Sequence, residues 1–150
     1  MKIKILIFLF GIGILSSCNN DDNSDFESTS INFTEIGKGA LYGNGQEGIP
    51  ESNMIIKNTN EWHNLISQMN SVNNVSDNFT EINVDFDEFL IVAIFLEVKG
   101  QGWGIQTENV IENENNITIS TLETEYETSV MTQPFCIVKM SNTEKTIIVE

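Results

Sequence analysis

The chain has 150 residues and a formal net charge of −15, with seven basic residues, all lysine, against 22 acidic ones. A chain of this length holds one domain, with or without a tail. The charge excludes partners that are held by clustered lysine or arginine, namely nucleic acids and anionic lipid surfaces. An acidic surface attracts cations or basic partners, and its simplest role is to keep the protein soluble.

The first seventeen residues have the layout of a bacterial secretory signal. Two lysines precede an uncharged run at residues 5–15 that is apolar except for two glycines. This run is shorter than the roughly 20 apolar residues that a membrane span requires. We therefore predict a signal peptide at residues 1–17.

The signal segment ends in Leu-Ser-Ser-Cys at residues 15–18, which resembles the lipobox of bacterial lipoproteins. The thiol of Cys18 is the nucleophile that receives the diacylglyceryl group, and the small residues before it give the peptidase access. Because two or more acyl chains, such as palmitate, hold a protein stably, we predict a lipid anchor at Cys18 in the cell envelope, at the outer membrane. The alternative is an ordinary signal peptide with a chance cysteine.

The only other cysteine, Cys136, has no disulfide partner if Cys18 is acylated. It lies in an apolar run at residues 135–138. We predict that it is a small buried hydrophobe rather than a reactive thiol.

Residues 18–30 are polar and acidic without an apolar period, which predicts a disordered tether. Acidic residues directly after the lipid cysteine resemble the surface-export signals of some Gram-negative lipoproteins, so the periplasmic and surface faces both stay open. Carboxylates and amides also suit calcium, but the run lacks the spaced glycine and distal glutamate of an EF-hand loop. We predict no metal site and no cofactor.

The folded domain is expected at residues 31–150. Alternation of apolar and polar residues at 31–36 predicts its first strand. Residues 37–50 carry five glycines and are predicted as a loop, because glycine supplies the positive φ that turns require. A short second strand is expected at 54–57.

Residues 59–69 predict one amphipathic helix. Asn58 is the expected N-cap, with Glu61 three residues later in a relation like a capping box. Four apolar side chains fall on one face at helical spacing: Trp62, Leu65, Ile66 and Met69. The single histidine, His63, points away from that face and is predicted to be solvated.

The second half of the domain has the patterns of strands. The apolar run at residues 89–96 is rich in β-branched residues, which predicts a central strand covered on both faces. Alternation around the polar turn at 112–116 predicts a long hairpin, and two more strands are expected at 135–140 and 145–149. Because the connections are short, we predict an α+β fold in which the helix packs on a mostly antiparallel sheet of about six strands.

Four short motifs follow one another along the domain: Glu61-Trp62, Val84-Asp85-Phe86, Gly-x-Gly-Trp-Gly-Ile at 100–105 and Thr-Gln-Pro-Phe at 132–135. In this order, over nearly all of residues 31–149, they resemble the C-terminal domain family of the protease complex subunit PrcB. The family is named for a lipoprotein subunit of a bacterial surface protease complex. The resemblance implies a non-catalytic, extracytoplasmic domain that binds or stabilises a protein partner. The chain has Phe135-Cys136 where the family often has tyrosine.

These observations favour a lipid-anchored accessory or protein-binding domain, as a subunit or stabiliser of an envelope protease complex. Tyr42 and Trp103, two aromatic residues in glycine-rich segments, are the candidate partner contacts. Packing in the core or in the hairpin is the alternative role for both. A carbohydrate- or peptidoglycan-binding module is an alternative function, in which such aromatic side chains act as platforms beside acidic and amide groups.

A hydrolase that uses paired carboxylates is a further alternative, and Asp85 and Asp87 are a pair of this kind. Among 22 acidic residues such pairs arise easily, and the simpler interpretation is a polar turn that leads into the next strand. A serine–histidine–aspartate triad would need His63 on its solvated helix face. We therefore predict that the chain is not an enzyme.

Overall fold

The computed structural model describes residues 26–100 and 102–150, so the signal peptide at 1–17 and Cys18 lie outside the described residues. The described chain forms eight strands, one α-helix and one short 3₁₀ helix. In chain order these are β1 (Thr29–Ser30), β2 (Phe33–Tyr42), β3 (Ser52–Ile56), α1 (Thr59–Met69), η1 (Val75–Asn78), β4 (Phe89–Phe95), β5 (Trp103–Glu112), β6 (Asn116–Glu125), β7 (Thr132–Ser141) and β8 (Thr146–Val149).

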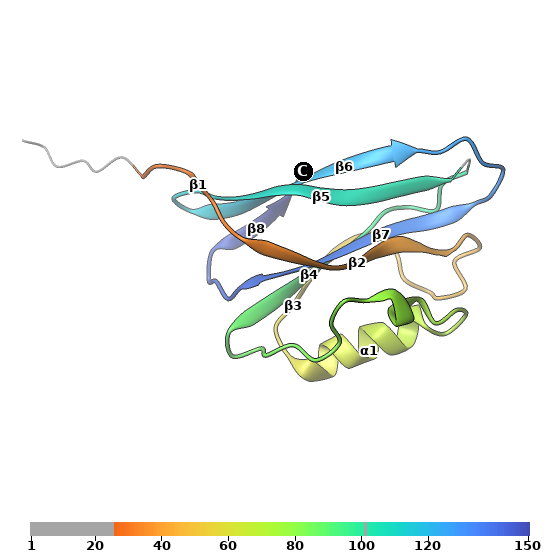
Figure 1. Ribbon diagram of the computed structural model, residues 1–150, viewed down its shortest axis with the longest axis horizontal. Coiled ribbons are helices and arrows are strands. Elements are labelled where there is room, and N and C mark those ends of the chain that lie inside the picture. Colours follow the sequence, from red (N-terminus) through yellow and green to blue (C-terminus); the bar gives the residue numbers. More distant parts are fainter. Residues whose placement is uncertain (1–25, 101) are drawn as a thin grey trace, which may run out of the picture.

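The elements form three layers (Figure 1). One four-stranded sheet has the order β1-β5-β6-β8, and the other has the order β2-β7-β4-β3. Helix α1 covers the face of the second sheet that is turned away from the first sheet. The α+β class, with one helix on mostly antiparallel strands, is confirmed. The single sheet of about six strands is wrong, because the strands divide into two sheets.

The division into two sheets follows from the central strand β4, which is apolar on both faces. Ile91, Ala93 and Phe95 belong to the core beneath α1. The alternate residues Leu90, Val92 and Ile94 belong to a second core between the two sheets. One helix covers only one face, so the other face must be covered by a second sheet. The prediction of a central strand buried on both faces is confirmed.

The last strand pairs differently from the prediction. β8 lies beside β6 in parallel, with Asn116 opposite Thr146, rather than antiparallel to β7. The link at residues 142–145 leads from one sheet to the other and does not form a hairpin. Four residues are enough for this crossing because the sheets of a sandwich lie only about 10 Å apart.

β2 is longer than the sequence predicts, because residues 37–42 continue the strand instead of forming a loop. Gly37 and Gly39 lie in this stretch, and at Gly37 an aromatic ring occupies the space that a side chain would fill. The Phe79 ring packs directly on Gly37, and the Phe135 ring lies 3.5 Å from the Cβ position of Gly39. The turn prediction holds further along, where Gly45 and Gly48 have φ angles of 69° and 67°.

The N-terminal chain changes sheets between β1 and β2. Thr29 and Ser30, which the sequence analysis assigned to the tether, pair with Glu112 and Ile111 of β5. The chain then crosses to the second sheet, where Phe33 of β2 pairs with Met140 of β7. The rest of β5 is therefore left without a neighbour on this side among the described strands.

Helix α1 spans the predicted residues 59–69, and the Asn58 side chain accepts a hydrogen bond of 2.9 Å from the Glu61 backbone N–H. Its apolar face packs Trp62, Leu65 and Met69 into the core. The Trp62 ring stacks on Phe79, and its Nε1–H donates to the Ile82 carbonyl at 2.8 Å. Trp62 therefore fixes the helix to the segment that follows it.

Replacing Trp62 by alanine is expected to lower the free energy of unfolding by roughly 3–5 kcal/mol, because a fully buried aromatic side chain is lost. Its exposed neighbour His63 supplies the control, since His63→Ala is expected to change stability by less than about 0.5 kcal/mol. Urea denaturation followed by far-UV circular dichroism measures both. Equal effects of the two substitutions would contradict the assigned packing of α1.

Candidate binding cleft

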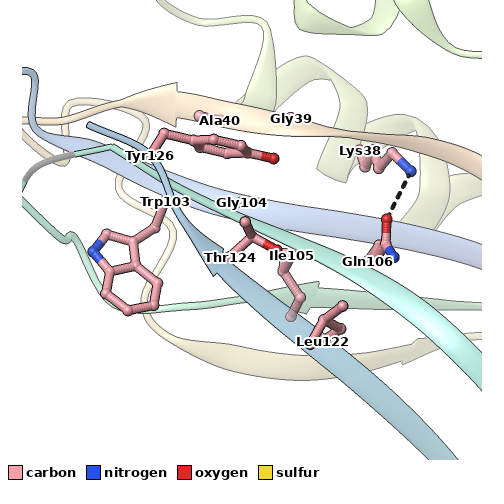
Figure 2. A pocket seen from close by; sticks show the side chains of 10 residues that line it. All are labelled: Lys38, Gly39, Ala40, Trp103, Gly104, Ile105, Gln106, Leu122, Thr124 and Tyr126. Carbon is pink, nitrogen blue, oxygen red and sulfur yellow. Dashed lines mark hydrogen bonds between the residues drawn. The ribbon is translucent and has the colours of Figure 1, made fainter. Parts of the chain in front are cut away.

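A cleft of about 280 Å³ opens between β2 of the second sheet and the β5–β6 pair of the first sheet. We call it the β2–β5 cleft, and Figure 2 shows its lining. It is lined by Lys38, Gly39, Ala40, Trp103, Gly104, Ile105, Gln106, Leu122, Thr124 and Tyr126. The cleft exists because the chain leaves β5 at Ile31 and runs along the other sheet as β2.

The Tyr126 ring forms one wall of the cleft. It lies over Gly104, where an added Cβ would come within 3.0 Å of its Cε2 and Oη atoms. The absence of a side chain at Gly104 lets the ring approach the strand this closely. The Tyr126 N–H donates to the Gly102 carbonyl at 2.8 Å, which fixes its backbone to the residue just before β5. The side chain is nevertheless 54% exposed, with its hydroxyl directed along the cleft (Figure 2).

Trp103 is half-buried at the same end of β5. The Lys99 Nζ lies 4.5 Å from the centroid of its ring, in cation–π contact, and also forms an ion pair with Glu123. These contacts hold Trp103 at the cleft while covering part of its surface. Trp103 therefore supplies an ordered apolar surface, whereas Tyr126 supplies an accessible one.

The polar end of the cleft is formed by Lys38 and Gln106. The Lys38 Nζ lies 3.1 Å from Glu35 Oε1 and donates to Gln106 Oε1 at 3.5 Å (Figure 2). The lysine charge is therefore compensated by Glu35. The Gln106 amide keeps N–H groups that it can offer to a ligand.

Of the two predicted partner contacts, Trp103 lines the cleft and Tyr42 does not. Tyr42 ends β2, two residues beyond the cleft residue Ala40, and is 52% exposed. Three further side chains of the cleft, those of Tyr126, Lys38 and Gln106, are not predicted from the sequence. One available indication is that Leu122, Thr124 and Tyr126 alternate along the chain and so share one face of a strand.

The loop after β2 is held by the polar side chains of Glu47 and Gln133, which are buried, and of Gln68, which is exposed. Glu47 Oε1 accepts a 2.9 Å hydrogen bond from the Tyr42 N–H. The Gln133 amide donates to the carbonyls of Ile49 and Leu96, at 2.9 and 3.0 Å. Gln68 of α1 donates to the Glu47 carbonyl. The end of β2 beside the cleft is thus fixed to both the helix and the sheet.

The acidic pair Asp85 and Asp87 lies in an exposed turn outside the cleft. Asp85 Oδ1 accepts a 3.0 Å hydrogen bond from the Asp87 N–H, and the Asp85 carbonyl accepts from Phe89 N–H, which begins β4. The interpretation as a polar turn that leads into the strand is confirmed. Within the described ranges, no three side chains of His, Cys, Asp or Glu form a group able to hold a metal ion.

Cys136 lies in the core between the two sheets and is fully buried, as predicted. Burial raises the pKa of its thiol above the ordinary value, and the contact with Thr107 Oγ1, at 3.5 Å, opposes this only in part. The thiol is therefore neutral in the folded protein, and inert, because the thiolate is the reactive form.

The raised pKa of Cys136 predicts a loss of stability at alkaline pH. In the unfolded chain the thiol loses its proton near its ordinary pKa of about 8.5, while the folded protein keeps it. The free energy of unfolding then falls by up to about 1.4 kcal/mol per pH unit, until the pH passes the folded pKa. Chemical denaturation from about pH 7 to about pH 10 measures this slope.

Cys136→Ala is the control, because it lacks the thiol but retains every other titrating side chain. Its stability is expected to fall less steeply than that of the wild type above about pH 8.5. Identical slopes for the two proteins would contradict the assigned burial of the thiol.

Comparison with protein-family models, with curated proteins and with solved structures finds no match for this chain. The resemblance to the PrcB C-terminal domain family therefore stays a prediction. Among residues 26–100 and 102–150, no helix has the length and apolar character needed to cross a membrane.

Proposed function

We propose that the chain is a lipid-anchored, extracytoplasmic accessory domain that binds a protein partner of the cell envelope through the β2–β5 cleft, without catalysis of its own. The observation that carries this proposal is the position of the cleft relative to the N-terminal chain. The aromatic end of the cleft and the strand that follows the tether lie at opposite ends of β5.

The distance between these ends follows from the length of β5. Thr29 of β1 pairs with Glu112, the last residue of β5, whereas Trp103 is its first residue. A strand of ten residues extends over roughly 30 Å. If lipid on Cys18 holds the protein at the outer membrane, the Trp103 end of the molecule is free to point away from the lipid.

The nature of the partner is inferred from the sequence. The resemblance to the PrcB family favours an envelope protease, which the domain would serve as a subunit or stabiliser. The acidic surface is consistent with a protein partner and disfavours nucleic acid. The exposed Tyr126 ring and the partly buried Trp103 are side chains of the kinds that anchor protein interfaces.

A carbohydrate- or peptidoglycan-binding module remains the second candidate. The observation in its favour is that the Tyr126 ring packs against Gly104 while the residue stays 54% exposed. Gln106 and Thr124 place an amide and a hydroxyl in the same cleft. The hydrolase alternative has less support, because Asp85 and Asp87 lie outside the cleft and take part in a turn.

Lipid attachment at Cys18 is tested by Cys18→Ser. We expect metabolic labelling with an alkyne fatty acid to be lost and the protein to move from the detergent phase to the aqueous phase, because serine cannot form the thioether. Cys136→Ala is the matched control and is expected to retain the label. Labelling that persists in Cys18→Ser would contradict the proposed anchor.

The binding surface is tested by photo-crosslinking in intact cells, with benzoylphenylalanine in place of Leu122 in the cleft. Ile55 of β3 supplies the control position, because it is an aliphatic residue outside the cleft with similar exposure, 45% against 42% for Leu122. We expect a discrete protein adduct from Leu122 and none from Ile55. The reason is that only the cleft would be covered by the partner.

The outcome separates the two candidates. A protein adduct that is lost in Tyr126→Ala supports the accessory domain. Adducts that become smaller after digestion with a peptidoglycan hydrolase would support the carbohydrate module instead. Equal labelling from Leu122 and Ile55 would contradict binding at the cleft.

A further inference from the structure

The first half of β5 has an unpaired edge. β1 pairs only with Ile111 and Glu112, and the Ile31 N–H donates to the Val110 carbonyl at 2.9 Å. No described strand pairs with β5 on this side between Trp103 and Thr107. A β-bulge between Thr107 and Asn109 separates this stretch from the part that β1 covers.

Hydrogen bonds of the β5–β6 hairpin show which backbone N–H and C=O groups of β5 point toward the unpaired edge. The Gly102 carbonyl accepts from Tyr126 N–H of the β6 segment, so alternate residues after Gly102 face β6. The Thr121 N–H, opposite Thr107, points away from β5 and donates to the Glu150 carbonyl at 2.8 Å. Both observations assign the backbone N–H and C=O groups of Trp103, Ile105 and Thr107 to the open side, which we call the β5 edge.

The β5 edge runs along the β2–β5 cleft, since residues 103–106 also line it. A segment that lay extended on this edge would gain backbone hydrogen bonds and place alternate side chains toward the cleft. Tyr126 and Leu122 present apolar surface there. The cleft is thus suited to a strand with one apolar or aromatic side chain at its centre.

The charges near the β5 edge indicate the charge of the segment that would bind there. Three exposed acids lie on or near this end of the β5–β6 hairpin: Glu108 directly after the edge, Glu125 opposite Trp103 on the neighbouring strand β6, and Glu127 two residues further along the chain. None of the three has an ion-pair partner among the described residues, whereas the nearby lysines are already paired with Glu35 and Glu123. A segment that carries lysine or arginine therefore complements the edge, and a second copy of this chain, with a net charge of −15, is repelled by it.

We propose that the β5 edge binds an extended, basic segment of the protein partner as an added strand, antiparallel or parallel to β5, with an apolar side chain in the cleft. This inference rests on the proposed function, since it uses the same cleft, and it specifies the mode of binding and the chemistry of the partner segment.

The probe for this proposal is a capped heptapeptide in which lysine alternates with valine around a central phenylalanine. Amide hydrogen exchange of the ¹⁵N-labelled protein is measured with and without the peptide. At a peptide concentration about ten times the Kd, exchange at Trp103, Ile105 and Thr107 is expected to slow about tenfold. Gly104 and Gln106, which already face β6, are expected to keep their exchange rates, which gives a pattern of period two.

Matched peptides and variants test the two parts of the proposal separately. Every second amide of an added strand bonds to β5, and the others face solvent. N-methylation of the bonding amides is expected to weaken binding about fivefold per lost hydrogen bond, whereas N-methylation of the solvent-facing amides is not. Glu125→Gln and Glu127→Gln are each expected to weaken binding about two- to fivefold, whereas Glu61→Gln on α1 is not. A peptide with glutamate in place of lysine is expected to bind the wild-type protein more weakly than the lysine peptide binds either glutamine variant.

Several results would overturn the added strand. If the peptide shifts the resonances of Trp103 and Tyr126 without slowing exchange at the β5 edge, binding at the cleft stands and the added strand does not. Protection at the edge that grows with protein concentration and without peptide would assign the edge to a second copy. Absence of any peptide binding, together with a protein adduct from Leu122, would reject the basic strand while leaving the proposed function intact.

Discussion

The antiparallel pairing of β4 with β7 is the constraint on which the rest of the structure depends. Both strands are buried along nearly their whole length, and their side chains alternate between two cores. A pair with two apolar faces requires two covers, which helix α1 and the other sheet supply. The cleft follows from this arrangement, because the chain must leave β5 to complete the sheet that holds β4 and β7, and β2 is the strand that does so.

The edge that this crossing leaves open is a liability in most proteins, because unpaired N–H and C=O groups invite pairing with another chain. Here the bulge between Thr107 and Asn109 shortens the open stretch. The exposed acids at 108, 125 and 127 place negative charge near this end of the β5–β6 hairpin, and a second acidic copy is disfavoured for that reason. The same features leave the edge accessible to a cationic segment, so protection against self-association and the proposed selection of a basic partner have one physical origin.

The elements that the sequence predicts well are those with a strong local pattern. The helix at residues 59–69 has a capping asparagine and an apolar face at helical spacing, and residues 89–96 contain an uninterrupted apolar run. The continuation of β2 through residues 37–42 was not predictable, because the role of Gly37 depends on the ring of Phe79, which is distant in sequence. The number of sheets likewise depends on which residues cover each face of β4.

The candidate site was predictable only in part for the same reason. Trp103 stands out in a glycine-rich segment, but its neighbours come from β2 and β6, some twenty residues or more away along the chain. Tyr126 is important because its ring packs against Gly104, two residues beyond the position opposite Gly104 in the hairpin, and no local pattern records that contact. A rigid scaffold buried on both faces thus positions an exposed aromatic side chain beside an open strand edge. Those two features together, rather than either alone, distinguish a surface that selects an extended segment from one that only presents a hydrophobic side chain.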